Sequence, residues 1–186
     1  PDGIRGLWKY ENKNMTVNYI ETVKKIINSI QKQNKILSCF FIESILGCGG
    51  QMILPDGYLK EVFKIVHKAG GVCIIDEVQT GFGRVGDKFW AFEDHKVIPD
   101  IVTLGKPMGN GHPISAVVTT REIANAFNNG MEYFNSFGGN PVSCAVGNAV
   151  LEVIENEQLQ NHAKEVGDYF LNSLKIIQKK YSQRIS

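Results

Sequence analysis

Apolar residues recur along the chain first at the spacing of a helix and then in a short unbroken run, and this alternation repeats. The first helix is expected to begin at Thr16, as its capping residue, and to end near Asn34. Its apolar face consists of residues three or four apart: Val17, Ile20, Val23, Ile27 and Ile30. The almost wholly apolar run 36–42, which leads to Glu43, is typical of a strand in the interior of a parallel sheet.

The alternation of helix and strand continues to the end of the chain. The further elements are predicted in this order: a helix over 58–69, strands over 72–75, 101–104 and 113–119, a long helix opened by Asn140 and Pro141, and a last helix from about Glu157. Strands separated by helices indicate an α/β fold. We therefore expect a mainly parallel sheet sandwiched by helices.

Composition narrows the class of partner. The chain has 186 residues, 43% of them hydrophobic, and a formal net charge of +1, which argues against nucleic acid or an acidic membrane surface as its partner. The four cysteines form no C-x-x-C pair and have no nearby histidine at ligand spacing, so no zinc site is predicted. A cytoplasmic location is expected, and a targeting segment before residue 1 leaves a mitochondrial location open.

Polar side chains follow three of the predicted strands where each strand ends. Glu43 follows the first, Asp76 the second, with Glu77 and Gln79 close behind it, and Lys106 the third. In open α/β sheets, ligands bind beyond the carboxyl ends of the strands. We therefore expect these side chains to converge on one site at one edge of the sheet.

An aspartate, an amide and a lysine together suit a heteroaromatic cofactor that carries a basic ring nitrogen and an aldehyde. Asp76 can keep the ring nitrogen protonated, Gln79 can hydrogen-bond the phenolic oxygen, and Lys106 can form a Schiff base with the aldehyde. Pyridoxal 5'-phosphate has these groups, and its ring acts as an electron sink. No metal is needed for this chemistry.

Two other features near these residues are interpreted as structural. Residues 81–86 match the dinucleotide pattern G-x-G-x-x-G, but that pattern requires a helix to begin within it directly after a strand. Here five residues separate it from the strand and no helical face follows, so nucleotide binding is not predicted. His112 is the one histidine close to Lys106 in sequence, and we expect it to order its loop through a hydrogen bond.

Three segments together resemble the class III aminotransferases, which are fold-type I pyridoxal-phosphate enzymes. They are IIDEVQTGFGR at 74–84, PDIVTLGK at 99–106 and FGGNP at 137–141. The resemblance runs over nearly the whole chain, in order and with the spacing of that family. It implies a pyridoxal-phosphate-dependent enzyme that acts as a homodimer with shared active sites on small-molecule amino donors and keto acids.

The resemblance also implies a role for each matching residue. Asp76 would pair with the pyridinium nitrogen, Val78 would pack on one face of the ring and Gln79 would lie by its phenolic oxygen. Lys106 would be the Schiff-base lysine and the proton shuttle of amino transfer. Two further residues have roles by position: Ser136 would reach the cofactor phosphate of the neighbouring subunit, and Glu43 would gate the substrate carboxylate by pairing with an arginine.

One departure from the family pattern leaves the reaction open. Most members have proline after the glutamate, whereas this chain has Ser44, and the runs 43–51 and 105–113 look most like the ethanolamine-phosphate and phosphohydroxylysine phospho-lyases. That branch uses the same lysine but eliminates phosphate. Our first hypothesis is a transaminase. The alternative is a phospho-lyase, and the second alternative is an inactive fragment or binding module.

The resemblance sets an expectation for domain organisation as well. Residues 1–186 would be a single partial domain, the second half of the large cofactor-binding domain. The segment from about 157 to 186 would then be a helix that leads toward a small C-terminal domain.

Overall fold

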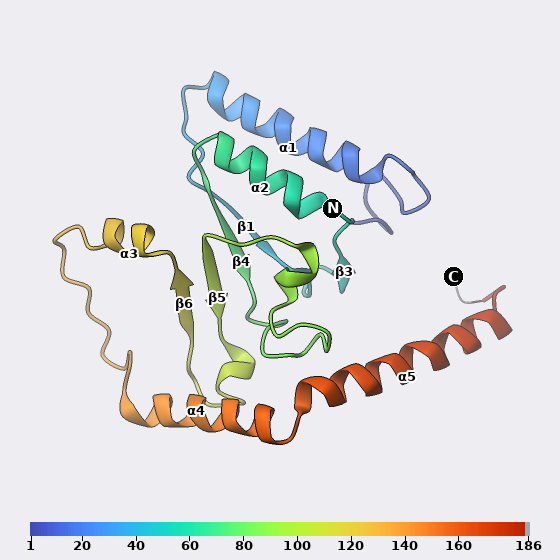
Figure 1. The fold of residues 1–186 in the computed structure, drawn as a ribbon. Helices are drawn as coiled ribbons and strands as arrows, with labels where there is room; N and C mark the ends of the chain where they lie inside the picture. The colour runs from blue at the N-terminus through green and yellow to red at the C-terminus, as the bar shows by residue number, and fades with distance from the viewer. Residues whose placement is uncertain (185–186) are drawn as a thin grey trace.

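The computed structural model, which describes residues 1–184, has a four-stranded sheet in the order β1-β4-β5-β6 (Figure 1). The strands are β1 (Cys39–Glu43), β4 (Val72–Asp76), β5 (Ile101–Leu104) and β6 (Ala116–Thr119). Strands β1, β4 and β5 are parallel to one another, and β6 runs antiparallel to β5. The expected α/β fold is confirmed, with a mixed, mostly parallel sheet flanked by helices.

The register brings three polar residues into one row at the carboxyl edge of the sheet. Glu43 is paired with Asp76, and Asp76 with Thr103. Partners in adjacent strands point to the same face, because side chains alternate along each strand. The carboxylates that end β1 and β4 therefore lie on one face, beside the hydroxyl of Thr103.

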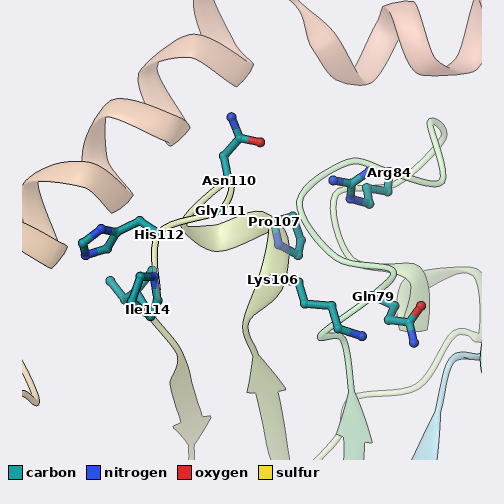
Figure 2. A pocket seen from close by; sticks show the side chains of 9 residues that line it. Gln79, Arg84, Lys106, Pro107, Asn110, Gly111, His112 and Ile114 are labelled. Atoms are coloured by element: carbon teal, nitrogen blue, oxygen red, sulfur yellow. The ribbon is translucent and has the colours of Figure 1, made fainter.

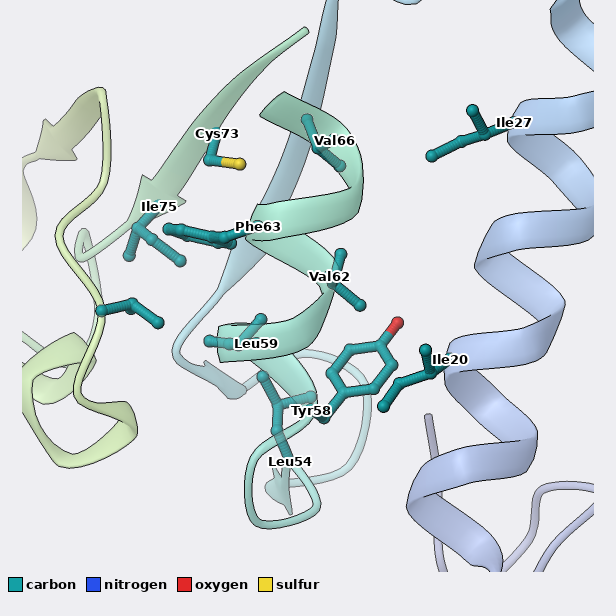
Figure 3. Packing of buried hydrophobic residues seen from close by; sticks show 11 residues of the cluster. Ile20, Ile27, Leu54, Tyr58, Leu59, Val62, Phe63, Val66, Cys73 and Ile75 are labelled. Carbon is teal, nitrogen blue, oxygen red and sulfur yellow. The ribbon is translucent and has the colours of Figure 1, made fainter. Parts of the chain in front are cut away.

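The other face of the sheet carries the main core. Helix α2 (Tyr58–Lys68) packs its apolar stripe against Cys73 and Ile75 of β4, and α1 (Met15–Lys32) covers α2 from outside through Ile20 and Ile27 (Figures 1 and 3). The stripe residues Leu59, Val62 and Val66 are fully buried. Gly70, with φ of 84°, ends α2 as expected, since a left-handed residue after a helix favours glycine.

The remaining helices are α3 (Arg121–Phe127), α4 (Pro141–Asn156) and α5 (Leu159–Lys180), with the short 3-10 turns η1 (Ala91–His95) and η2 (Lys106–Met108). Of these helices, α4 and α5 lie toward the edge of the sheet at which β4 and β5 end, and α3 follows β6 at the opposite edge (Figure 1). Asn140 caps α4 as predicted, because its Oδ1 accepts the backbone N–H of Ser143 at 2.9 Å. No helix among residues 1–184 has the length and apolarity to cross a membrane.

The glycine pattern at 81–86 lies in a loop against which the start of α5 packs. A Cβ at Gly83 would lie 3.0 Å from Gln160 Cβ, and one at Gly86 would lie 2.8 Å from Lys164 Cα. Gln160 Nε2 donates to the carbonyl of Gly86 at 2.9 Å, and Lys164 Nζ pairs with Asp87 at 2.7 Å. These glycines therefore allow a close helix contact, which accounts for the pattern without a nucleotide.

Three sequence predictions of element boundaries are wrong. The cap of α1 is Asn14 rather than Thr16, because the Asn12 side chain accepts the Asn14 N–H at 2.9 Å and starts the helix earlier. The first strand begins at Cys39 rather than at 36, since its partner β4 begins only at Val72. The fourth strand is shorter than predicted and begins at Ala116.

Helix α3, the strands β2 and β3 and the 3-10 turns η1 and η2 were not predicted. Helix α3 is seven residues long and has no buried residue, so it carries no apolar stripe. The glycine-rich loop after β1 contains a small hairpin of β2 (Ile45–Leu46) and β3 (Met52–Ile53).

Candidate functional site

A pocket of about 540 Å³ opens where the chain leaves β4 and β5 (Figure 2). Gln79 lines it from the segment after β4, and Lys106 from the turn η2 after β5. Figure 2 shows the Lys106 side chain extending toward Gln79, with Arg84 in the same view. The structure thus brings together two of the polar side chains that the sequence predicted to converge.

Lys106 is held in an uncommon backbone conformation. Its φ is 33°, in the left-handed region that side chains other than glycine rarely adopt. Such strain costs about 1–3 kcal/mol and is found preferentially at functional sites. Its side chain is exposed, and no acidic group pairs with it among residues 1–184.

Asp76 is paired with Thr103 across the sheet. Thr103 Oγ1 is the one buried side-chain polar atom in the described part of the chain that lacks a hydrogen-bond partner. Asp76 Oδ1 accepts the backbone N–H of Val78 at 2.8 Å, which fixes the carboxylate. A buried hydroxyl without a partner is costly. The pair therefore indicates a place at the sheet edge where another polar group would bind.

Gln79 is fixed by the loop after β1. Its Nε2 donates to Cys48 Sγ at 3.2 Å. A Cβ at Gly47 would lie 3.2 Å from Gln79 Oε1 and 3.0 Å from Glu43 Oε2, so a methyl group here would displace one of these side chains by a few tenths of an ångström. The Glu43 carboxylate accepts the Gly47 N–H at 3.0 Å.

Glu77, next to Asp76, is a fully buried carboxylate, and no basic side chain among residues 1–184 pairs with it. It accepts four hydrogen bonds instead: from Ser44 Oγ at 2.5 Å, Thr80 Oγ1 at 2.9 Å, Ala91 N at 3.1 Å and Phe92 N at 2.8 Å. Ser44, the residue that departs from the family pattern, is thus one of its donors. Glu77 joins three segments that are distant in sequence and holds the chain that carries Asp76 and Gln79.

Ser136 is not brought to this pocket. It lies in the exposed segment between α3 and α4 and does not line the pocket. Its expected role at the site of a neighbouring subunit stays a prediction, as do the roles of Asp76, Val78, Gln79, Lys106 and Glu43 toward a cofactor. The His112 ring is hydrogen-bonded to Ser143 Oγ at 2.8 Å, which confirms that this histidine orders its loop.

The opposite edge of the sheet carries a second polar group that sequence spacing did not reveal. Asp100 Oδ2 accepts the backbone N–H of Cys73 and a hydrogen bond from His67 Nε2, both at 2.7 Å. Burial, and then the charge of Asp100, raises the pKa of the Cys73 thiol to about 12. The buried thiol stays protonated, so this group orders the start of β4.

The residues at the carboxyl edge fit pyridoxal phosphate by their chemistry. Asp76 Oδ2 has no donor among residues 1–184 and can accept from a protonated ring nitrogen, and the Thr103 hydroxyl beside it lacks a partner. The Gln79 amide and the Lys106 amine open into one pocket large enough for a small aromatic ring. Val78 lies close by, since a Cβ at Gly105 would lie 3.4 Å from its Cγ1.

Comparisons with known proteins point to the same family. The family model for class III aminotransferases matches residues 7–186. The alanine–glyoxylate aminotransferase 2-like protein of Drosophila melanogaster is 53% identical over 163 residues, which are 87% of this chain and 33% of that protein. Ethanolamine-phosphate phospho-lyase homolog 1 of Caenorhabditis elegans is 42% identical, covering 97% of this chain and 41% of its own length.

A solved structure agrees with these sequence matches. A phospholyase from Arthrobacter in complex with phosphoethanolamine matches with a TM-score of 0.88 and 40% identity, over 96% of this chain and 42% of that one. The chain thus spans 33–42% of the length of these relatives. From the family match and the shared fold, the chain belongs to the class III aminotransferases, a family that depends on pyridoxal phosphate.

Proposed function

We propose that the complete protein is a pyridoxal-phosphate-dependent transaminase that exchanges an amino group between an amino acid or amine and a keto acid. The observation that carries the proposal is the common pocket of Lys106 and Gln79. The row of Asp76 and Thr103 lies at the same carboxyl edge of the sheet and does not line that pocket. When bound, the cofactor supplies an electron sink for negative charge on the substrate carbon.

The residues of this chain have distinct roles in that reaction. Asp76 binds the protonated ring nitrogen, Val78 packs on the ring and Gln79 donates to its phenolic oxygen. Lys106 would hold the cofactor covalently through Nζ. Once the substrate amine has taken its place on the cofactor, the freed Nζ would move a proton within the pocket that it lines. Glu43 gates the substrate carboxylate from the end of β1.

The role of Lys106 is tested with Lys106→Ala in the complete protein. Amino transfer should fall by at least about 10²-fold, because the variant lacks both the attachment point and the proton-transfer group. Borohydride reduction should fix the cofactor on the peptide that contains residue 106 in the wild type and leave no such adduct in the variant. Lys88→Ala, an exposed lysine that does not line the pocket, is the matched control and should retain both.

A phospho-lyase is the second candidate, favoured by the match to a phospholyase solved with phosphoethanolamine and by Ser44 in place of the proline common in the family. Elimination uses the same lysine, but the neighbouring substrate carbon must carry a leaving group. Incubation with phosphoethanolamine and no keto acid distinguishes the two. Release of phosphate and ammonia identifies the lyase. No release there, together with amino transfer in a second incubation that contains an amino donor and pyruvate or glyoxylate, identifies the transaminase.

The remaining alternative is a module that binds no cofactor. A complete wild-type protein with no cofactor absorption and no borohydride adduct would support that alternative and contradict both enzyme proposals.

We further propose that the protein is a homodimer in which Ser136 serves the neighbouring site. Its support is that Ser136 lies outside the pocket of its own chain. Sedimentation of the complete protein as a monomer would contradict it.

A further inference from the structure

The orientation of the Gln79 amide is set by its contacts with the loop Gly47–Gln51. The nitrogen donates to Cys48 Sγ at 3.2 Å. The oxygen lies against Gly47, where an added Cβ would be 3.2 Å away. The two ends of the amide therefore meet different surroundings, a sulfur on one side and a glycine on the other.

This loop is itself held at both ends. Gly47 donates its N–H to Glu43 Oε2 at 3.0 Å, and its carbonyl accepts from Gln51 Nε2 at 3.0 Å. The hairpin of β2 and β3 closes the loop through the pairs Ile45–Ile53 and Leu46–Met52. Cys48 is thus presented to Gln79 by an anchored turn.

The contact with the thiol uses the nitrogen end of the amide. The Cys48 sulfur accepts from Gln79 Nε2, and the oxygen end lies against Gly47. A side-chain amide nitrogen carries two hydrogens, and the contact with Cys48 uses one of them. The second N–H then remains for an acceptor in the pocket that Gln79 lines.

We propose that the loop Gly47–Gln51 orients Gln79 toward the cofactor and that Cys48 is its positioning residue. The inference rests on the proposed function, because the acceptor of the second N–H is the phenolic oxygen of pyridoxal phosphate. In this arrangement Glu43 has a second role besides gating, as the acceptor that anchors the loop.

The first test measures the dissociation constant of pyridoxal phosphate by absorbance titration of the stripped, complete protein. Cys48→Ala should raise the constant about three- to tenfold, the range of one modest hydrogen bond. Gln79→Ala should raise it at least as much, and the double variant should be no worse than Gln79→Ala alone, because the two residues act through one contact. Cys144→Ala, an exposed cysteine on α4, is the matched control.

The second test distinguishes positioning from a merely structural role. A hydrogen bond to the ionised phenolic oxygen lowers the pH at which the bound cofactor changes its absorption. Cys48→Ala and Gln79→Ala should both raise that pH midpoint, and Cys144→Ala should leave it unchanged. All the charged groups around Gln79 stay in place in these variants: Glu43 from β1, Asp76 from β4, and Arg84 and Lys106 from the pocket.

A third variant approaches the amide from its other side. Gly47→Ala would place a methyl group 3.0 Å from Glu43 Oε2 and 3.2 Å from Gln79 Oε1, and it should weaken cofactor binding by a similar factor. Gly167→Ala, whose Cβ would meet nothing within 4 Å, is its control.

The outcomes separate this inference from the proposed function. If the wild type binds the cofactor and both Cys48→Ala and Gly47→Ala match their controls within twofold, the positioning role is overturned and the function stands. If the effects of Cys48→Ala and Gln79→Ala multiply in the double variant, Cys48 acts independently of Gln79 and the role is likewise overturned. If the wild type binds no cofactor, both proposals fail together.

Discussion

The Glu77 carboxylate shows how a single buried residue organises the site without entering the pocket. Its carboxylate accepts from two hydroxyl and two backbone donors, and no cation pairs with it in the part of the chain that the structure describes. Donors aimed at an ionised carboxylate are worth more than ordinary hydrogen bonds, and losing one leaves a buried charge short of a partner. The Ser44 hydroxyl is such a donor, and it is itself fully buried.

We expect Ser44→Ala to lower the free energy of unfolding of the complete protein by about 1–3 kcal/mol. The matched control is Ser173→Ala, because that half-buried residue donates through its hydroxyl to a carbonyl within its own helix at 2.9 Å. The control should change stability by less than about 0.5 kcal/mol. Urea unfolding measures both, and equal losses in the two variants would contradict the role assigned to Ser44.

At the scale of elements, the helix α5 and the loop 81–87 depend on one another. The helix approaches so closely that glycine is needed at Gly83 and Gly86, and the contact is completed by the Gln160 and Lys164 side chains. The same loop carries Arg84, which lines the pocket. The position of α5 is therefore linked to one wall of the site.

Two glycine substitutions test this dependence in opposite directions. Gly86→Ala should destabilise the protein by at least about 1–2 kcal/mol, because its φ of 81° is unfavourable for alanine and its Cβ would meet the α5 backbone at 2.8 Å. Gly167→Ala, within α5 and without a neighbour for the new methyl group, should stabilise it by about 0.5–1 kcal/mol. Thermal unfolding of both variants measures the difference, and a neutral Gly86→Ala would show that the helix contact is dispensable.

At the scale of the whole molecule, stability comes from the layer between α2 and the sheet, and this layer holds two groups with displaced titration. Burial raises the pKa of the Cys73 thiol to about 12, and it raises that of the Tyr58 hydroxyl to about 12. Both groups lose their protons more easily in the unfolded chain than in the folded one. For each group, the folded state therefore loses stability as the pH rises from the group's pKa in the unfolded chain to its pKa in the folded chain.

For Cys73 that interval begins near pH 9, its ordinary pKa, and ends near 12. We expect the free energy of unfolding to fall by up to about 1.4 kcal/mol per pH unit and per proton there. Below pH 9, Cys73→Ala should lower stability through lost packing; above pH 9 it should lack the Cys73 share of the slope, while the Tyr58 contribution remains. Cys144→Ala is the control and should keep the slope of the wild type. Denaturant unfolding from pH 8 to 11 compares the wild type with the two variants. Identical slopes in the wild type and Cys73→Ala would contradict the assignment.

The longer elements of the fold follow from sequence because their cause is local. The α1 and α2 stripes, the buried β4 strand and the Asn140 cap of α4 are each specified by residues a few positions apart. Boundaries were predicted less well, since the start of β1 depends on where its partner β4 begins. Helix α3 escaped prediction because it buries none of its residues and so shows no apolar period.

The sequence by itself determined the alternation of helices and strands, the polar residues that end β1, β4 and β5, and the family to which these residues belong. These are properties of neighbours along the chain. Only the tertiary structure decided that Glu43, Asp76 and Thr103 form one row, that Ser44 donates to Glu77 and that Cys48 meets Gln79. Strand register and close backbone approach bring together residues 27 or more positions apart, and no local periodicity encodes such pairs.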